Sequence, residues 1–245
     1  MQNMVVKVKL ELAARAAVQA VRRKDLIVVI DVLRCTSSIL NAFANGAKEV
    51  IPTRTLREAH RLRESHPSFL LAGERRGVRP QGFDLGNSPL EFTRQKVSGR
   101  TLIFTTTSGT AALIRSKESD WVLIGGFLNA GSVASAALEI AEREEIGVSL
   151  VLSGRKGHFS LEDFLCGGAI AGRLLGTNVD LSDSTTGALL AFRQVKEILC
   201  ETIMTGEHVR NLIDLGFEED VRFSCQMDLL GNVPAYRNGV IRLLA

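Results

Sequence analysis

Carboxylates and hydroxyls come directly after several apolar runs of this sequence. Asp31 follows LIVVI, and Glu74 follows FLLAG. The polar run Thr106, Thr107 and Ser108 follows TLIFT. Short apolar runs of this kind are typical of buried strands. Because ligands bind at the carboxyl ends of strands in open α/β sheets, we expect these side chains to lie together at one edge of a sheet.

Grouped carboxylates favour a hard divalent cation, because like charges in one site otherwise repel each other. Mg²⁺ takes oxygen ligands and usually keeps water and substrate phosphate in its shell. The predicted Mg²⁺ ligands are Asp31, Glu74, Glu162 and Asp163, with Asp84 and Glu91 as second choices. One carboxylate from the set Asp31, Glu74 and Asp84 would orient the attacking water as a general base.

Arginines, hydroxyls and an amide near the same strand ends suit the oxygens of an anion. Arg34 and Arg155 can supply bidentate contacts to phosphate or sulfonate. The turns RCTSS and TTTSGT offer hydroxyls and backbone N–H groups at helix starts. The residues predicted to hold substrate oxygens are Arg34, Thr106, Thr107, Ser108, Asn129 and Arg155. This set indicates metal-assisted phosphoryl transfer or hydrolysis of a small anionic ester.

A long charged loop lies between two of the predicted strands. Residues 71–92, LAGERRGVRPQGFDLGNSPLEF, contain four glycines and two prolines and show neither helical nor strand periodicity. Long loops without elements of their own are uncommon and often functional. We expect this loop to bring Glu74, Asp84 and Glu91 over the strand ends, where they close on the substrate.

Each of these residues also has an ordinary structural role that the sequence leaves open. Thr107 and Ser108 can cap a helix. Glu162 and Asp163 can complement a helix dipole, and SLED fits a capping box. In the loop, the carboxylates can serve as turn and cap residues. His158 is better explained as a turn residue than as a base.

Strand-like and helix-like segments alternate along the chain. The predicted strands are 26–33, 48–53, 69–73, 101–107, 121–127 and 147–154, followed by two short ones at 221–228 and 239–245. The predicted helices are 35–47, 56–66, 108–117, 129–144, 161–175 and 187–206. This alternation predicts an α/β fold with helices on both faces of a largely parallel or mixed sheet. We expect one compact domain over residues 1–245, or two closely packed lobes.

Composition excludes several functional classes. The net charge of +3, from 30 basic and 27 acidic residues, is too balanced to indicate nucleic-acid binding. The four cysteines form no CxxC pair, which argues against a zinc site and a disulfide framework and fits a reducing cytoplasm. The N-terminal residues lack the apolar core of a signal peptide, and no apolar run approaches the roughly 20 residues of a membrane helix. We therefore expect a cytoplasmic protein without a membrane partner.

Familiar signatures of covalent phosphatases are missing from the sequence. Asp31 is followed two positions on by Leu33, so the Asp-x-Asp motif of haloacid-dehalogenase-type enzymes is not formed. Cys166 and Arg173 are one residue too far apart for the Cys-x5-Arg loop of tyrosine phosphatases. Neither a GxSxG elbow nor a Walker A loop is present. Direct attack by a metal-activated water is the better prediction.

Several long motifs together resemble one enzyme family. VVIDVLRCTSSI, ANGAKEVIP, AGERRGVRPQGFDLGNSPLEF, TTTSGTAAL, GGFLNAGSVA and GHFSLEDFLCGGAI stand in family order over residues 28–170, and VPAYRNGVI follows near the C-terminus. They resemble the 2-phosphosulfolactate phosphatase family. The resemblance implies a three-layer α/β/α fold. It also implies a Mg²⁺-dependent phosphatase that converts 2-phosphosulfolactate to sulfolactate and phosphate, in the route to coenzyme M.

Two other functions stay open at the level of sequence. One is a phosphatase of another small phosphorylated acid, such as phospholactate or phosphoglycolate. The other is a catalytically silent anion-binding protein on the same fold, although a pure anion binder has no use for clustered carboxylates. The sequence leaves the oligomeric state open, and a homodimer is our working expectation.

Overall fold

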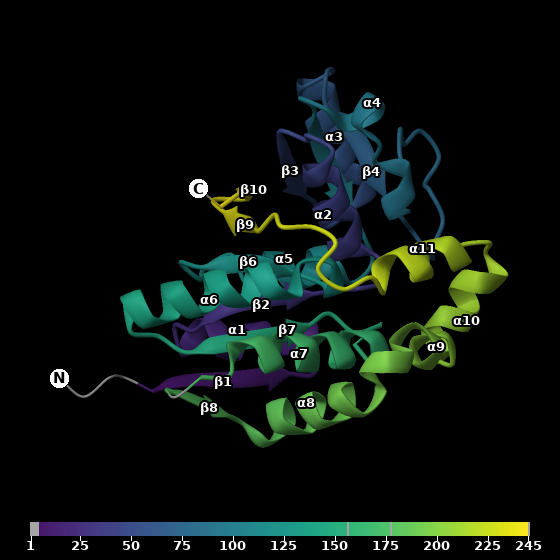
Figure 1. Cartoon of the computed structure of the whole chain (residues 1–245). Coiled ribbons are helices and arrows are strands. Elements are labelled where there is room, and N and C mark those ends of the chain that lie inside the picture. Colours follow the sequence, from purple (N-terminus) through teal and green to yellow (C-terminus); the bar gives the residue numbers. More distant parts are fainter. Residues whose placement is uncertain (1–4, 156, 177, 245) are drawn as a thin grey trace.

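The computed structural model describes residues 5–155, 157–176 and 178–244, and within them the chain builds one ten-stranded sheet (Figure 1). The strand order is β4-β5-β3-β10-β9-β6-β2-β7-β1-β8. The strands are β1 (Val6–Glu11), β2 (Leu26–Ile30), β3 (Glu49–Pro52), β4 (Leu70–Gly73), β5 (Thr101–Thr105), β6 (Val122–Gly125), β7 (Val148–Leu152), β8 (Val179–Leu181), β9 (Pro234–Arg237) and β10 (Val240–Leu243).

The strands form two parallel groups that a C-terminal hairpin joins. One group contains β4, β5 and β3, and the other contains β6, β2, β7, β1 and β8. The hairpin strands β9 and β10 are antiparallel to each other and to their outer neighbours, β6 and β3. Because three successive pairings are antiparallel, the two parallel groups run in opposite directions.

Curvature of the sheet brings the strand ends of both groups together. In a flat sheet of this topology, the C-terminal ends of the two groups would point to opposite edges. Figure 1 shows β3 and β4 standing steeply against β2 and β7. As a result, the residues that follow β2, β4, β5 and β7 surround a single cavity.

Helices cover both faces of the sheet. The helices are α1 (Ala17–Arg22), α2 (Cys35–Ala44), α3 (Leu56–Ser65), α4 (Arg94–Val97), α5 (Gly109–Arg115), α6 (Ala130–Glu144), α7 (Leu161–Leu174), α8 (Asp183–Val195), α9 (Leu199–Met204), α10 (Glu207–Asp214) and α11 (Glu218–Ser224). Short 3₁₀ turns lie at Ala14–Ala16, Pro89–Glu91, Phe127–Asn129 and Lys196–Ile198. Helices α6 and α7 pack on one face of β2, and α1 and α5 pack on the other.

Strand β2 is a continuous apolar run, LIVVI, because both of its faces are buried. All five of its residues are buried. Leu26, Val28 and Ile30 belong to the core under α6 and α7, whereas Ile27 and Val29 belong to the core under α1 and α5. A strand buried on both faces loses the alternation of polar and apolar residues. The prediction of a three-layer α/β/α fold with a mixed sheet is confirmed.

Several segments differ from the sequence-based prediction. Strands β8 and β9 were not predicted, and the helix predicted at 187–206 is divided into α8, a 3₁₀ turn and α9. Residues 221–228 were expected to form a strand, but Glu218–Ser224 forms helix α11. Three acidic residues in its first turn favour a helix N-terminus, and Val221 and Cys225, one helical turn apart, are both buried. Strand β1 was not predicted, although its residues VKVKLE alternate between buried and more exposed positions. It pairs with β7 and β8 inside the sheet.

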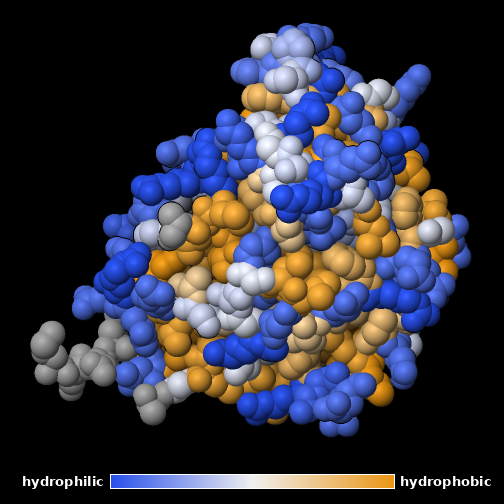
Figure 2. All heavy atoms as spheres, turned by 45° about the horizontal axis from the view of Figure 1, so that its top comes forward, coloured by the Kyte–Doolittle hydropathy of each residue, from blue (hydrophilic) through white to orange (hydrophobic). Residues whose placement is uncertain are grey.

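The surface mixes charged and apolar side chains. Figure 2 shows one face on which apolar patches interrupt the hydrophilic surface. Apolar atoms contribute much of the surface of ordinary monomers, so the expected homodimer stays a prediction. In the described part of the chain, no helix combines the length and the apolar character needed to cross a membrane.

Candidate active site

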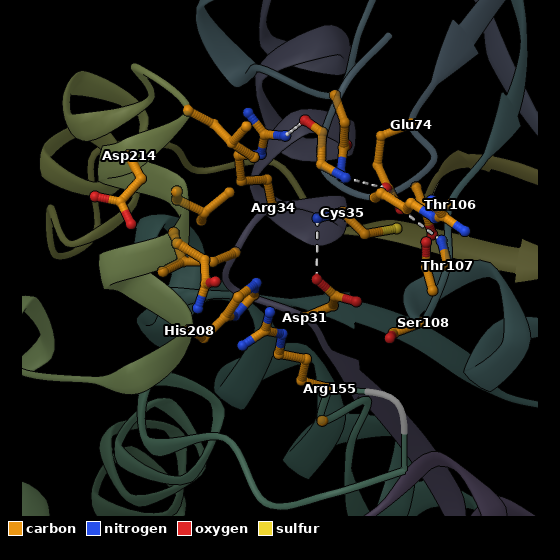
Figure 3. A pocket seen from close by; sticks show the side chains of 18 residues that line it. Asp31, Arg34, Cys35, Glu74, Thr106, Thr107, Ser108, Arg155, His208 and Asp214 are labelled. Atoms are coloured by element: carbon orange, nitrogen blue, oxygen red, sulfur yellow. Dashed lines mark hydrogen bonds between the residues drawn. The ribbon is translucent and has the colours of Figure 1, made fainter. Parts of the chain in front are cut away.

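A cavity of about 370 Å³ lies where the ends of β2, β4, β5 and β7 meet helix α10 (Figure 3). Seven of the residues predicted from the sequence line it, namely Asp31, Arg34, Glu74, Thr106, Thr107, Ser108 and Arg155. The remaining lining comes from the loop after β4 and from the C-terminal helices. The prediction that strand ends converge on one place therefore describes this cavity.

Asp31 follows β2 and is 6% exposed. Its Oδ1 atom accepts a hydrogen bond from the backbone N–H of Cys35, 3.1 Å away, at the start of α2. Burial raises the pKa of the Asp31 carboxyl to about 6, and the negative charges of Glu74 and Glu162 act in the same direction. A pKa so close to neutrality in a cavity is typical of functional carboxyl groups.

Glu74 joins the turn after β5 to the loop after β4. Its Oε1 atom accepts the backbone N–H of Thr107 at 2.6 Å, and its Oε2 atom accepts that of Gly77 at 2.8 Å. The residue before it, Gly73, has a φ of +133°, and a Cβ atom there would lie 1.9 Å from the carbonyl oxygen of Thr105. Only glycine permits this close approach, which fixes where Glu74 enters the cavity.

The β5–α5 turn contributes hydroxyl groups to the cavity. Thr106 and Thr110 exchange bonds, because each hydroxyl accepts the backbone N–H of the other residue. Thr107 and Ser108 line the cavity, and the Ser108 side chain makes no capping hydrogen bond to helix α5. The expected capping role of Ser108 is therefore not observed, and its hydroxyl group faces the cavity.

The two second-choice carboxylates of the loop lie outside the cavity lining. Asp84 accepts the backbone N–H of Leu71 at 2.8 Å and pairs with Arg63 at 2.9 Å. Glu91 accepts the backbone N–H of Gly86 at 2.9 Å. Both side chains hold the loop to its own scaffold, so the expectation that they close over the strand ends is corrected. Of the three acidic residues of this loop, Glu74 alone lines the cavity.

Asn129 was predicted to contact substrate oxygens, but its side chain is fully buried away from the cavity. Its Oδ1 atom accepts the N–H of Gly126 at 3.0 Å. Its Nδ2 atom donates to the carbonyl oxygens of Ile124 and Asn232, at 3.1 and 3.0 Å. The amide therefore ties the end of β6 to the segment before β9, and no polar atom is left for a ligand.

Arg34 lines the cavity but is already paired. Its guanidinium group donates to Asp220 on α11 at 2.7 Å and to the carbonyl oxygen of Gly77 at 2.5 Å. The same group lies over the Phe217 ring, 3.9 Å from its centre. Ser88 donates to the second oxygen of Asp220 at 2.6 Å. Arg34 thus joins α2, the loop after β4 and the C-terminal helices, and its buried guanidinium group is held in place by these contacts.

Helix α10 supplies a residue that was not predicted from the sequence. The Nδ1 atom of His208 lies 2.6 Å from Oε1 of Glu162, which is buried behind the cavity wall. Burial raises the pKa of the Glu162 carboxyl, but the hydrogen bond and charge of His208, together with hydrogen bonds from the helix backbone and Ser160, outweigh burial and lower the pKa overall. Glu162 is therefore ionised, and it accepts a hydrogen bond from the Nδ1–H group of His208. The second ring nitrogen of His208 is left for the cavity, on the side of Asp31 (Figure 3).

Asp163 also lies behind the cavity wall and braces two strand ends. Its Oδ1 atom accepts the N–H of Val32 at 2.9 Å, and its Oδ2 atom accepts that of Gly154 at 3.0 Å. Burial raises the pKa of this carboxyl, as do the charges of Asp31 and Glu162. Asp163 thus holds the residues after β2 and β7 together. Both of its oxygens are already engaged with backbone donors.

Cysteine chemistry is disfavoured at this site. Cys35 lines the cavity at the start of α2 and is 1% exposed. Burial raises the pKa of its thiol well above the ordinary value, and the charge of Asp31 raises it further. The thiolate is the reactive form of cysteine. This agrees with the missing Cys-x5-Arg motif.

The carboxylates at the cavity do not form a closed metal site in the described residues. In the described residues, no three His, Cys, Asp or Glu side chains lie close enough to hold an ion by themselves. Asp31 and Glu74 face the cavity, and Oδ2 of Asp31 has no hydrogen-bond partner among the described residues. Mg²⁺ commonly uses one or two carboxylates and completes its shell with water and substrate phosphate. The donor set fits this arrangement.

Sequence reasoning missed His208 and Asp220 because no local pattern marks them. Both lie on short helices of the last third, which carry no strand end and no recognisable motif. His208 follows the N-cap residue Gly206 and the acidic first-turn residue Glu207, and it resembles any polar residue of an amphipathic helix. Only the tertiary fold brings it to Glu162, 46 residues earlier in the chain.

Comparisons with known proteins all give one enzyme family. A family model described as 2-phosphosulpholactate phosphatase matches residues 13–239. A protein of Thermotoga petrophila is 44% identical over 216 residues, which is 88% of this chain and 91% of that protein. A protein of Clostridium beijerinckii is 35% identical over 239 residues, which is 96% of this chain and 98% of that protein. Both relatives are named probable 2-phosphosulfolactate phosphatase. This chain belongs to the 2-phosphosulpholactate phosphatase family.

Proposed function

We propose that this chain hydrolyses 2-phosphosulfolactate to sulfolactate and phosphate. The family and the names of its relatives support this substrate. The observation that carries the proposal is the convergence of two buried carboxyl groups, Asp31 and Glu74, on one cavity beside the hydroxyl groups of Thr107 and Ser108. A carboxylate placed in this way can orient an attacking water molecule and accept its proton. The cavity volume of about 370 Å³ suits a small ester.

Mg²⁺ is the proposed cofactor. Asp31 would hold it through Oδ2, which has no hydrogen-bond partner among the described residues, and Glu74 through the remaining lone pairs of the two oxygens that accept the N–H groups of Thr107 and Gly77. Glu162 and Asp163 lie behind the cavity wall and do not line it. The bound ion would offset the charge of both carboxylates and of the phosphoryl oxygens. This narrows the ligand set predicted from the sequence to two residues, with water and substrate oxygens as the remaining ligands.

The side chains around the cavity divide into three roles. Asp31 orients a water molecule and takes its proton as the water oxygen attacks phosphorus. The hydroxyl groups of Thr107 and Ser108 donate to phosphoryl oxygens. They lie on the other side of Asp31 from His208 (Figure 3). In its imidazolium form, with the Nδ1 proton held by Glu162, His208 delivers its Nε2 proton to the ester oxygen as the phosphorus–oxygen bond breaks, so that sulfolactate leaves as the alcohol. Glu162 positions the imidazole for this step through the Nδ1 bond.

Phosphate release tests the proposed function. The purified chain is incubated with 2-phosphosulfolactate in Mg²⁺ and, separately, in EDTA, and the Asp31→Asn variant serves as the inactive control. We expect Mg²⁺-dependent release that the variant loses. Release that is unchanged in EDTA would reject the metal. Faster release from 2-phospholactate or phosphoglycolate would assign another substrate, and binding without turnover would indicate an anion-binding protein. A place in coenzyme M formation stays a prediction that depends on the first outcome.

A further inference from the structure

The cations around the cavity are not equally available to a ligand. Arg34 is 3% exposed and is held by Asp220 and by the carbonyl oxygen of Gly77. In contrast, the guanidinium group of Arg155 has one carboxylate contact, to Glu207 at 3.9 Å. The Glu207 side chain is 87% exposed. An ion pair so long and so solvated contributes little. Arg155 can therefore exchange it for a ligand anion at small cost.

Hydrogen bonds hold the described residues on both sides of Arg155. Gly154 has a φ of +61°, and its N–H is bound by the buried carboxylate of Asp163. A Cβ atom on Gly154 would lie 2.2 Å from the carbonyl oxygen of His158. Arg155 and His158 exchange backbone hydrogen bonds of 3.1 and 2.9 Å across the turn. A positioned arginine loses less entropy when it binds an anion than one on a mobile loop.

Arg155 and the phosphoryl-binding groups lie on different sides of the cavity. Figure 3 shows Arg155 next to His208, with Asp31 between them and the turn that carries Thr107 and Ser108. If the phosphoryl group lies between Asp31 and that turn, the rest of the substrate points toward Arg155. In 2-phosphosulfolactate, the sulfonate group is two carbons from the ester oxygen. It is the part of the molecule that reaches farthest from phosphorus.

We propose that Arg155 is the specificity-determining residue that binds the sulfonate group of the substrate. This inference rests on the proposed function and adds the residue that recognises the non-reacting end of the ester. The planar guanidinium group can donate two parallel N–H bonds to two sulfonate oxygens. A phosphorylated acid without a second anionic arm would leave this group unpaired and would bind more weakly.

Arg76 is the rival for this role. It lines the cavity from the loop after β4, and its guanidinium group has no ion pair among the described residues. Its side chain is exposed, whereas that of Arg155 is 32% exposed and sits on the braced turn. Ordering an exposed arginine costs more side-chain entropy. This difference favours Arg155, and the comparison of the two arginines belongs in the test.

The test compares two substrates that differ at one position. 2-Phospholactate carries a hydrogen atom where 2-phosphosulfolactate carries the sulfonate group. The variants are Arg155→Gln, Arg155→Lys and Arg76→Gln, with Arg210→Gln as the control. Arg210 is exposed on α10, outside the cavity lining, and donates to the carbonyl oxygen of Thr205. The quantity measured is kcat/KM for each substrate and its division between kcat and KM.

Arg155→Gln should lower kcat/KM for 2-phosphosulfolactate by about 10- to 100-fold, mainly through KM, and leave 2-phospholactate within about twofold. Arg155→Lys should recover part of the loss, because lysine keeps the charge but not the paired donors. Equal losses on both substrates would overturn the proposal, since Arg155 would then act on the phosphoryl group or on the fold. A sulfonate-selective loss in Arg76→Gln alone would also overturn it.

A binding measurement separates this inference from the proposed function. If the wild-type chain hydrolysed neither substrate, the proposed function would fail, but the sulfonate site could still be examined by calorimetry with sulfolactate and lactate. We expect the wild-type chain to bind sulfolactate more tightly, and Arg155→Gln to lose most of that difference. If the wild-type chain and Arg155→Gln preferred sulfolactate over lactate by the same factor, the role of Arg155 would be rejected whatever the enzymatic result.

Discussion

Asp31 combines burial with negative charge, and this combination has a cost in stability. Its carboxyl group is desolvated, and two further carboxylates, Glu74 and Glu162, raise its pKa together with burial. A group with a raised pKa in the folded state binds protons more tightly there than in the unfolded chain. The ionised form therefore destabilises the fold at neutral pH. Strained or destabilising groups of this kind are often retained for function.

The Asp31→Asn variant should be inactive but more stable than the wild-type chain at pH 8 in EDTA. The folded pKa of about 6 lies above the ordinary aspartate value of 3.8, so the destabilisation develops as pH rises between these values and is constant above them. We expect a gain of about 1–3 kcal/mol at pH 8 that disappears below about pH 4. Urea unfolding at several pH values measures it. A variant that is less stable than wild type at pH 8 would contradict the assigned shift.

His208 can be tested through the leaving group. A sulfolactate alkoxide needs a proton as it departs, whereas a nitrophenolate leaves without one. His208→Gln should therefore lower kcat on 2-phosphosulfolactate by about 10²- to 10³-fold. It should change kcat on p-nitrophenyl phosphate by less than about tenfold. Equal losses on both esters would assign His208 a role in binding or folding. The variant Asn211→Ala, which changes a neighbouring lining residue, controls for disturbance of α10.

The loop after β4 is organised as a connector between elements. Its first carboxylate, Glu74, holds the β5 turn, and its second, Asp84, holds the loop to β4 through the N–H of Leu71. Farther along, Ser88 contacts Asp220 on α11. The loop thus contacts the sheet at one end and the C-terminal helices at the other. The length and the charged residues of this loop therefore have two roles: they make these contacts between elements, and they supply part of the cavity lining.

Gly73 should be the least replaceable glycine of this loop. Alanine there combines a φ of +133° with a Cβ atom 1.9 Å from a backbone oxygen, so β4 or β5 must move. We expect Gly73→Ala to cost several kcal/mol, about 3 or more, and to displace Glu74. Gly99→Ala is the matched control, because its φ is +69° and nothing lies within 4 Å of the added Cβ. It should cost about 1 kcal/mol. Chemical denaturation of both variants measures the difference, and equal costs would contradict the close approach.

Helix α11 is anchored through one buried ion pair. Asp220→Ala would leave the guanidinium group of Arg34 buried without its carboxylate, and we expect a loss of about 3–5 kcal/mol in urea unfolding. Arg222→Ala on the same helix is the control. Its pair with Glu218 joins side chains that are 55% and 46% exposed, so its loss should change the free energy of unfolding far less than the loss of Asp220. Similar costs for the two variants would mean that Arg34 finds another partner.

Sequence patterns predicted the elements better than they predicted the contacts between them. Runs such as LIVVI and TLIFT mark strands because both faces are buried, and the residues after them line the cavity. The interval 221–228 failed because apolar residues at positions 221, 223 and 225 also fit a strand. Patterns over a few residues carry no information on what packs against them. For that reason His208 and the Arg34–Asp220 pair were visible only in the folded chain.

At the scale of the whole molecule, the cavity belongs to both parallel groups of strands. Asp31 and Arg155 come from the group that contains β2, and Glu74 and Thr107 come from the group that contains β4. Within the described residues, the β9–β10 hairpin is the only strand pairing between the groups. The relative placement of Asp31 and Glu74 therefore depends on this hairpin and on helix α5, which contacts both β2 and β3. A single turn or motif cannot encode such a placement, which explains why sequence reasoning identified the residues but not the geometry.

Ile241 on β10 provides the test at this scale. Its side chain is fully buried and pairs in register with Val50 of β3. Ile241→Ala should cost about 2–5 kcal/mol through the cavity that it leaves. Because the hairpin joins the two groups, we also expect the activity of the folded fraction to fall severalfold, through less exact placement of Glu74 opposite Asp31.

Ile140→Ala is the matched control for this prediction. Ile140 lies on α6 and is 4% exposed. It packs in the core against the group of strands that contains β2, away from the hairpin. Its replacement should cost a similar free energy of unfolding but leave the activity of the folded fraction unchanged. Phosphate release and urea unfolding are measured on the same samples, at a temperature where both variants are folded. If both variants kept full activity per folded molecule, the helices α10 and α11 and the loop after β4 would be sufficient to hold the two sides of the cavity together.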